Sequence, residues 1–365
     1  MMQALSRARQ ALWLGGSLLV LLALPLSSCG DGDSLASSES PGPPVDSTPP
    51  PDSTTPPPDT TTPPPTDTTP PLPPDTTTPP PPDSTLQPGE CPPVTGSSPA
   101  PVHVGLALGP THVPPGSFGD LYTGTQITAL TSSCLLADLE KARRANVRVF
   151  ISFTGNEQHN RDENGFSFTK WKSRVDRFRD ADLTPYIEDG TILAHLLMDE
   201  PTDPNNWNGK IVTHQEINDM ANYSKEVWPT MSTYIRTWPE YLIGGQFPNL
   251  DALWFHYLDR WGDLDAFLEK HLGDLRQVGL KVIGGLNVLN GGSDTSGIPG
   301  KGQGKHAMSA DEVRTWGAKF FAEPNMCAFL LWEWDAEYLA RPDIRAAVEE
   351  LAAKARAYPK QSCAR

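Results

Sequence analysis

The sequence has no block of lysine and arginine residues and lacks the short motifs that usually mark nucleotide or acyl chemistry. Binding to a nucleic-acid backbone requires clustered basic residues, so we expect no nucleic-acid partner. No G-x-G-x-x-G or P-loop motif and no G-x-S-x-G elbow occurs, so a bound nucleotide and an esterase of that type are not expected either. The cysteines are not closely paired, and no His/Cys/Asp cluster has metal-ligand spacing. The expectation is therefore a protein without metal or cofactor.

The first 28 residues predict a signal peptide. Arg7 and Arg9 precede an apolar run from Ala11 to Leu26, which is short for a membrane span and is followed by small residues. The stretch "LSSCG" resembles a bacterial lipobox, whose cysteine becomes the lipidated first residue. Cys29 is thus expected to anchor an exported protein to a bacterial membrane, facing the periplasm or the cell exterior. The alternative is an ordinary signal peptide with an incidental cysteine.

Residues 29–90 predict a disordered linker. Proline, threonine, serine and aspartate dominate, as in "PPPDSTTPPPDTTTPPP". Such a segment has almost no apolar surface to bury, so it cannot offset the entropy of ordering its backbone. Its prolines favour an extended, semi-rigid spacer. The linker carries ten acids and no base, so the net charge of −15 leaves residues 91–365 only mildly acidic.

From residue 91 onward, the pattern predicts one (β/α)₈ TIM-type barrel. Apolar runs alternate with segments of helical spacing, which implies a parallel sheet covered by helices. The predicted strands are 101–108, 147–153, 191–198, 231–237, 250–258, 280–288 and 327–335, and the predicted helices are 132–146, 171–180, 214–228, 264–279, 309–322 and 342–358. An eighth strand would be hidden in 111–130 or 178–189. An open doubly wound sheet competes, but no glycine-rich phosphate loop follows the first strand.

Four cysteines remain besides Cys29, and an even number in an exported chain suggests two disulfides. In a barrel, Cys327 at the start of the last strand lies at the amino-terminal face. Cys363 follows the final helix and should return to the same face. We therefore predict the disulfide Cys327–Cys363 and, with it, Cys91–Cys134.

Polar and aromatic residues follow the ends of the predicted strands, where barrel enzymes place their catalytic groups. In chain order they are Thr154, Asn156 and Glu157; Asp199 and Glu200; Arg236 and Trp238; His256 and Tyr257; Asn287 and Asn290; and Trp332, Glu333, Trp334 and Asp335. Hydrogen-bonding groups, carboxylates and tryptophans therefore gather at one end of the barrel. The pattern favours a pocket there over a set of unrelated surface turns.

Three of these stretches resemble the barrel glycoside hydrolases of clan A. Asp199-Glu200-Pro201 is similar to the clan's Asn-Glu-Pro, "WFHYL" to a later strand with a His and a Tyr, and "LLWEWD" to the closing strand with its tryptophan. The resemblance implies that Glu200 is the acid/base. Two features depart from the clan: the next-to-last strand, "KVIGGLNVLN", carries Asn287 and Asn290 and no acid, and Glu200 follows the third predicted strand rather than the fourth.

Glycoside cleavage requires two carboxyl groups that flank the bond. Asp199 and Glu200 are adjacent, so on an extended strand they are expected to point to opposite faces and not to form that pair. The second catalytic carboxylate is predicted to be Glu333 or Asp335. Asp199 has an alternative role as a loop cap or an ion-pair partner of Arg236, and Glu333 as a structural acid.

The remaining strand-end residues are expected to bind the substrate, because aromatic faces stack well on sugars. This predicted set is Asp199, Arg236, Trp238, His256, Tyr257, Asn287, Asn290, Trp332 and Trp334; the tryptophans have an alternative role as core. The long glycine-rich loop after residue 286 brings Lys301, Lys305 and His306, which would suit an anionic sugar if the loop is not simply a surface loop.

The sequence thus predicts a monomeric, lipid-anchored protein that hydrolyses glycosidic bonds in an oligo- or polysaccharide. The competing interpretation is a barrel that binds glycan or cell-wall material without cleaving it, and the missing acid near Asn287 favours that alternative.

Overall fold

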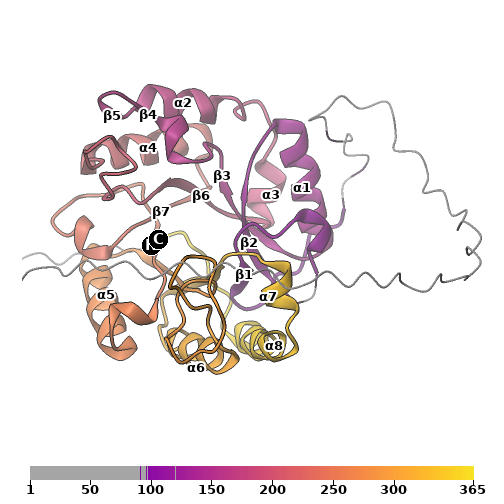
Figure 1. Ribbon diagram of the computed structural model, residues 1–365. Coiled ribbons are helices and arrows are strands. Elements are labelled where there is room, and N and C mark those ends of the chain that lie inside the picture. The colour runs from indigo at the N-terminus through magenta and orange to yellow at the C-terminus, as the bar shows by residue number, and fades with distance from the viewer. Residues whose placement is uncertain (1–90, 92–95, 97, 120) are drawn as a thin grey trace, which may run out of the picture. The chain divides into compact units, whose positions relative to one another are not determined.

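The computed structural model describes residues 91, 96, 98–119 and 121–365 (Figure 1). The predicted signal peptide, Cys29 and the linker 29–90 lie outside the described residues. Eight parallel strands form one sheet, and they follow one another around it in chain order. They are β1 (Ala107–Pro110), β2 (Gly124–Thr128), β3 (Arg148–Ser152), β6 (Ile192–Asp199), β7 (Ser232–Arg236), β8 (Ala252–Trp254), β9 (Lys281–Asn287) and β10 (Met326–Trp332).

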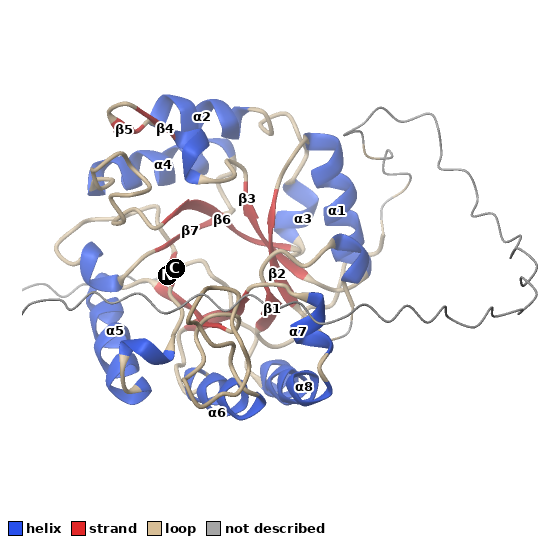
Figure 2. Ribbon diagram, viewed as in Figure 1, coloured by secondary structure: helices blue, strands red, loops and turns tan. Residues whose placement is uncertain are grey.

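The sheet closes into a barrel between β1 and β2. Thr123 N–H donates to the Leu108 carbonyl and His112 N–H to that of Gln126, both at 2.8 Å. Two glycines permit this approach: a Cβ on Gly109 would lie 2.1 Å from the carbonyl oxygen of Gly124. The ring of strands with helices around it (Figure 2) confirms the predicted (β/α)₈ fold, and its closure excludes the doubly wound alternative.

The strand missing from the predicted set is β2, which lies in one of the two segments expected to hide it. Glu200 therefore follows the fourth strand of the barrel, which removes one departure from the clan A pattern. The first strand was predicted over 101–108 but occupies Ala107–Pro110. Gly105 has a φ of +63°, a left-handed conformation that interrupts extended backbone, and this moves the start of the strand.

Helices lie outside the strands, as Figure 2 shows. They are α1 (Ser132–Arg144), α2 (Phe168–Asp176), α3 (Thr184–Glu188), α4 (His214–Val227), α5 (Leu264–Val278), α6 (Ala310–Phe320), α7 (Ala336–Ala340) and α8 (Pro342–Ala357). The six predicted helices correspond to α1, α2, α4, α5, α6 and α8, while the short helices α3 and α7 were not predicted. Capping boxes begin α4 at Thr213 and α6 at Ser309, where each hydroxyl accepts the N–H of a glutamate three residues on.

Short elements complete the loops. Four 3₁₀ helices are η1 (Pro115–Ser117), η2 (Glu157–Asn160), η3 (Pro239–Leu242) and η4 (Asp259–Trp261), and β4 (Arg161–Asp162) pairs with β5 (Gly165–Phe166) in a small hairpin. All of them follow the carboxyl end of a barrel strand. These loops therefore build the rim at the end where the sequence predicts a pocket.

The apolar core has two parts on opposite faces of the strands. The larger part packs the outer strand faces against the helices. The smaller part fills the barrel and combines small residues such as Ala194 and Ala328 with the large rings of Phe150, Tyr234 and Trp254. Trp254 is completely buried, so its ring fills the centre of the barrel near the carboxyl ends.

The described residues contain the two predicted disulfides. Cys91–Cys134 ties the start of the domain to α1, and Cys327–Cys363 ties β10 to the segment after α8. Disulfides of this kind are typical of oxidising compartments, which agrees with an extracytoplasmic location. Within the described residues, no helix combines the length and the apolar character needed to cross a membrane.

Candidate active site

A cavity of about 660 Å³ opens at the carboxyl ends of the strands. It is lined by Glu200, Thr202, Asp203, Pro204, Arg236, Thr237, Trp238, Trp254, Phe255, His256, Leu258, Arg260, Trp261, Asn287 and Trp332. Six predicted site residues thus meet here: Glu200, Arg236, Trp238, His256, Asn287 and Trp332. They come from five strands distant in sequence, because parallel strands bring their carboxyl ends to the same face.

The Arg236 guanidinium organises the acidic side of this cavity. Its Nη2 lies 2.9 Å from Glu200 Oε1, and its Nε donates to Asp199 Oδ1. The same group lies 5.3 Å from the ring centroid of Trp254 and 5.5 Å from that of Trp332, within cation–π range. Although burial opposes the charged form, the two carboxylates raise the pKa of Arg236. Arg236 is therefore a fixed cation between two acids and two indoles.

The prediction that Asp199 and Glu200 point to opposite faces is wrong, because both bind Arg236. Strand alternation ends at this point: β6 is irregular in its pairing with β7 between Leu196 and Met198, and Glu200 has a left-handed φ of +43°. The backbone turn at Glu200 brings its side chain round to the guanidinium. Of the two alternatives for Asp199, the ion pair with Arg236 is the one observed.

Glu157 adds a third carboxyl group to this charge cluster. It begins η2 after β3 and lines a small neighbouring cavity together with Thr154 and Asp199. Burial raises the pKa of Glu157, and the negative charges of Asp199 and Glu200 raise it further, while Arg236 acts in the opposite direction. The sequence places Glu157 at a strand end, but only the adjacency of β3 and β6 in the barrel brings it beside Asp199.

Aromatic rings form the floor and one wall of the cavity. The Trp254 and Trp332 rings lie 6.2 Å apart at its base. Trp238 contacts Trp261 edge-on at 4.6 Å, and Trp261 stacks on His256 at 5.9 Å with the planes 10° apart. Flat aromatic faces of this kind are suited to the C–H faces of sugar rings. Trp261 was not among the predicted residues, because η4 carries it beyond the strand end.

Several buried polar atoms of the cavity-lining residues have no hydrogen-bond partner within the described part of the chain. They are Thr237 Oγ1, Trp254 Nε1 and His256 Nδ1. Burial, together with the charges of Arg236 and Arg260, lowers the pKa of His256 well below its usual value, so its imidazole is neutral. Unpaired buried polar groups are costly. Their concentration here is expected of a site that hydrogen-bonds a polar ligand.

Six predicted residues, with Asp199 among them, are not among those that line the cavity. Tyr257 packs against Phe267 in the outer core, and its hydroxyl donates to the Gly262 carbonyl. Asn290 accepts the N–H of Gly302 and so holds the long loop. Trp334 contacts Tyr122 beside α7 at a separate small cavity.

The two acids of the closing strand have partners of their own. Asp335 caps α7 through the N–H of Tyr338 and forms an ion pair of 2.6 Å with Lys301. Lys301 and the Tyr338 N–H lower the pKa of Asp335. Glu333 follows Trp332 through a cis peptide bond and lies 3.3 Å from His112 Nδ1. Asp335 is thus held as a helix cap, whereas the Glu333 side chain is partly exposed beside His112.

The long glycine-rich loop folds back on itself. Lys305 accepts the Gly300 N–H through its carbonyl, His306 accepts that of Gly292, and His306 bridges to Pro299. Of the basic residues expected to suit an anionic sugar, Lys301 pairs with Asp335. Lys301, Lys305 and His306 are not among the residues that line the cavity.

No protein-family model and no curated protein matches this sequence. Solved structures with a similar fold include a β-glucuronidase of an uncultured Clostridium sp., with 9% identity and a TM-score of 0.44 over 63% of this chain and 44% of that one. An intracellular xylanase of Thermoanaerobacterium saccharolyticum has 11% identity and a TM-score of 0.45, over 67% of this chain and 95% of the xylanase. A β-mannanase of Streptomyces thermolilacinus has 10% identity and a TM-score of 0.42, over 64% of this chain and 79% of the mannanase. This chain thus spans less than half of the β-glucuronidase, and likeness at this level concerns the fold alone.

Proposed function

We propose that this protein hydrolyses glycosidic bonds in an oligo- or polysaccharide that binds at the carboxyl ends of the barrel strands. The observation that carries the proposal is the cavity itself. Glu200 follows the fourth strand and lines the cavity together with four indole rings, and three buried polar atoms of its lining residues have no hydrogen-bond partner among the described residues. Aromatic surface suits the faces of sugars, and the polar atoms suit their hydroxyl groups. Glu200 is the proposed general acid/base.

A carboxylate partner for Glu200 is available from two places. Asp203 lines the same cavity, and its carboxylate accepts the backbone and side-chain N–H groups of Asn205 at 2.9 Å. Glu333 lies at the carboxyl end of the closing strand, as the sequence predicts. Asp335 is a weaker choice because it caps α7. We propose Glu200 with either Asp203 or Glu333 as the catalytic pair, and single substitutions separate the two.

A second candidate function is a barrel that binds glycan without cleaving it. Asn287 occupies the end of β9, where the clan A resemblance calls for a nucleophilic glutamate. Glu200 also forms an ion pair with Arg236, whereas a proton donor must be protonated, so the substrate would have to loosen that pair before cleavage.

Reducing-end release from a polysaccharide panel, measured alongside binding to the same polymers, tests both functions. Glu200→Gln keeps the shape of the side chain but cannot exchange a proton. Its rate should fall by about 10²–10⁴-fold, the usual contribution of general acid–base catalysis, while the fold and binding are retained. Asp203→Asn and Glu333→Gln identify the second carboxylate. Binding without release by the wild type would favour the non-catalytic barrel, and absence of both would refute the two functions together.

We further propose that the domain of residues 91–365 is presented at the end of the linker by a lipid anchor at Cys29. Support comes from the lipobox-like stretch and from the two disulfides, which agree with export.

A further inference from the structure

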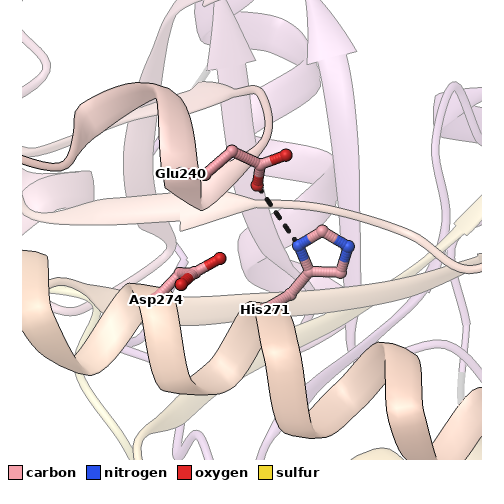
Figure 3. A group of neighbouring side chains, drawn as sticks. All are labelled: Glu240, His271 and Asp274. Atoms are coloured by element: carbon pink, nitrogen blue, oxygen red, sulfur yellow. Dashed lines mark ion pairs between the residues drawn. The ribbon is translucent and has the colours of Figure 1, made fainter.

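Three side chains with metal-ligating atoms converge outside the cavity, as Figure 3 shows. Glu240 comes from η3, and His271 and Asp274 come from α5. His271 and Asp274 are three residues apart on one helix, so they share a face. One ligand atom from each of the three residues lies within 4.8 Å of the others. Sequence patterns do not reveal this group, because its members come from two separate elements.

His271 is the least exposed member of the cluster. Its side chain is only 9% exposed, and its Nδ1 makes no hydrogen bond within the part of the chain that the structure describes. That nitrogen lies 3.4 Å from Glu240 Oε2, so it faces the carboxylates (Figure 3). The ring stacks on Trp238 with centroids 5.0 Å apart and contacts Phe267 at 4.4 Å, which fixes its direction. An imidazole nitrogen that faces carboxylates completes a set of donor types that divalent transition metals accept.

The cluster already holds one cation. Lys270 Nζ lies 2.9 Å from Asp274 Oδ2 and 3.3 Å from Glu240 Oε2. Its side chain is more than half exposed, so the ammonium can move into solvent when another cation binds. The ammonium and a metal ion would therefore compete for the same carboxylates.

We propose that Glu240, His271 and Asp274 bind a divalent transition-metal ion, for which Zn²⁺ is the best match, in competition with the Lys270 ammonium. One imidazole and two carboxylates form a donor set that Zn²⁺ accepts, and three protein ligands leave a coordination position for water. The bound ion would join η3 to α5. Because Trp238 precedes η3 and stacks on His271, the ion would also fix one wall of the cavity. The site requires no glycosidase activity, so it stands apart from the proposed function.

Isothermal titration of the full-length protein with Zn²⁺ tests the site, and thermal unfolding with and without the ion provides a second readout. The wild type should bind one ion at this site, and its melting temperature should rise with Zn²⁺. His271→Gln and Asp274→Asn should each weaken binding about tenfold or more, since even changes to the partners of metal ligands usually have effects of that size. Lys270→Met should strengthen binding, because it removes the competing cation. His159→Gln, which alters an exposed histidine elsewhere, should leave the affinity unchanged.

An increase in the affinity for Zn²⁺ on Lys270→Met is the decisive result, because a variant that merely misfolds cannot bind the ion more tightly. The proposal is overturned if the wild type and Lys270→Met both fail to bind Zn²⁺. It is equally overturned if His271→Gln in the Lys270→Met background, still folded by circular dichroism, binds as tightly as Lys270→Met alone.

Discussion

The pair of acids on Arg236 leads to a quantitative prediction for Arg236→Gln. The side chains of Arg236 and Asp199 are only 14% and 21% exposed, so removal of the cation leaves a carboxylate in a largely dry environment. Breaking a buried pair by removing one partner usually costs about 3–5 kcal/mol. Glu200 is 45% exposed, so solvent can replace much of its interaction, and its share should not exceed about 1 kcal/mol. We expect a total loss of about 3–4 kcal/mol.

Urea unfolding followed by tryptophan fluorescence would measure this loss. Arg314→Gln is the matched control, because Arg314 pairs with Glu350 at 2.8 Å on the surface, where solvent screens the pair, and its loss should cost much less stability. In a double-mutant cycle, Asp199→Asn should recover part of the loss in the Arg236→Gln background, with a coupling energy of about 2 kcal/mol. A loss no larger than that of Arg314→Gln, or a coupling energy near zero, would refute the structural role given to Arg236.

Three further predictions concern the closure of the barrel between β1 and β2, the carboxylates around Arg236 and the proposed lipid anchor. Gly109→Ala should destabilise the domain by about 1–3 kcal/mol in urea unfolding, because the added Cβ would meet a backbone oxygen where β1 approaches β2. At Gly116 an added Cβ would meet nothing within 4 Å, so Gly116→Ala should be neutral. Equal effects of the two substitutions would contradict the described closure of the barrel. The pKa of Glu157 is raised in the native state, whereas the unfolded state loses this proton near the ordinary pKa of 4.5. The stability of the native state therefore falls as the pH rises through and above 4.5. Thermal unfolding of Glu157→Gln should therefore show a gain in stability over wild type that grows as the pH rises above the ordinary value of 4.5, and a pH-independent difference would count against this account. Cys29→Ala should release the protein from the membrane fraction, and unchanged partitioning would rule out the lipid anchor.

Apolar periodicity was sufficient to predict most of the fold, because most strands are buried on both faces and most helices are amphipathic. It missed β2, whose sequence "GTQIT" places polar groups inside the protein. Thr125 Oγ1 donates to the Pro110 carbonyl at 2.7 Å, and Gln126 Oε1 accepts from the Tyr234 hydroxyl at 3.4 Å. These polar residues are buried because they are hydrogen-bonded to other strands of the barrel, and hydropathy alone cannot reveal such partners.

Strand ends were a good guide to the cavity only for residues that lie on or directly after a strand. Arg236, Asn287 and Trp332 end their strands and line the cavity. Arg260 and Trp261 line it from η4, several residues beyond β8, and no strand pattern points to them. Conversely, Asp335 lies beyond the end of β10, where its carboxylate caps a helix instead of facing the cavity.

The stretch "MDEP" shows why the chemistry of the site depends on geometry that the sequence does not state. Simple alternation separates Asp199 from Glu200, yet the left-handed residue after β6 brings both carboxylates to one guanidinium. Arg236 belongs to the next strand, and the register pairs it with Asp199. The arginine can therefore hold Asp199 as a permanent partner and Glu200 as a more exposed, exchangeable one. Under the proposed function, that inequality would allow a bound sugar to compete for Glu200 without breaking the buried pair of Arg236 and Asp199.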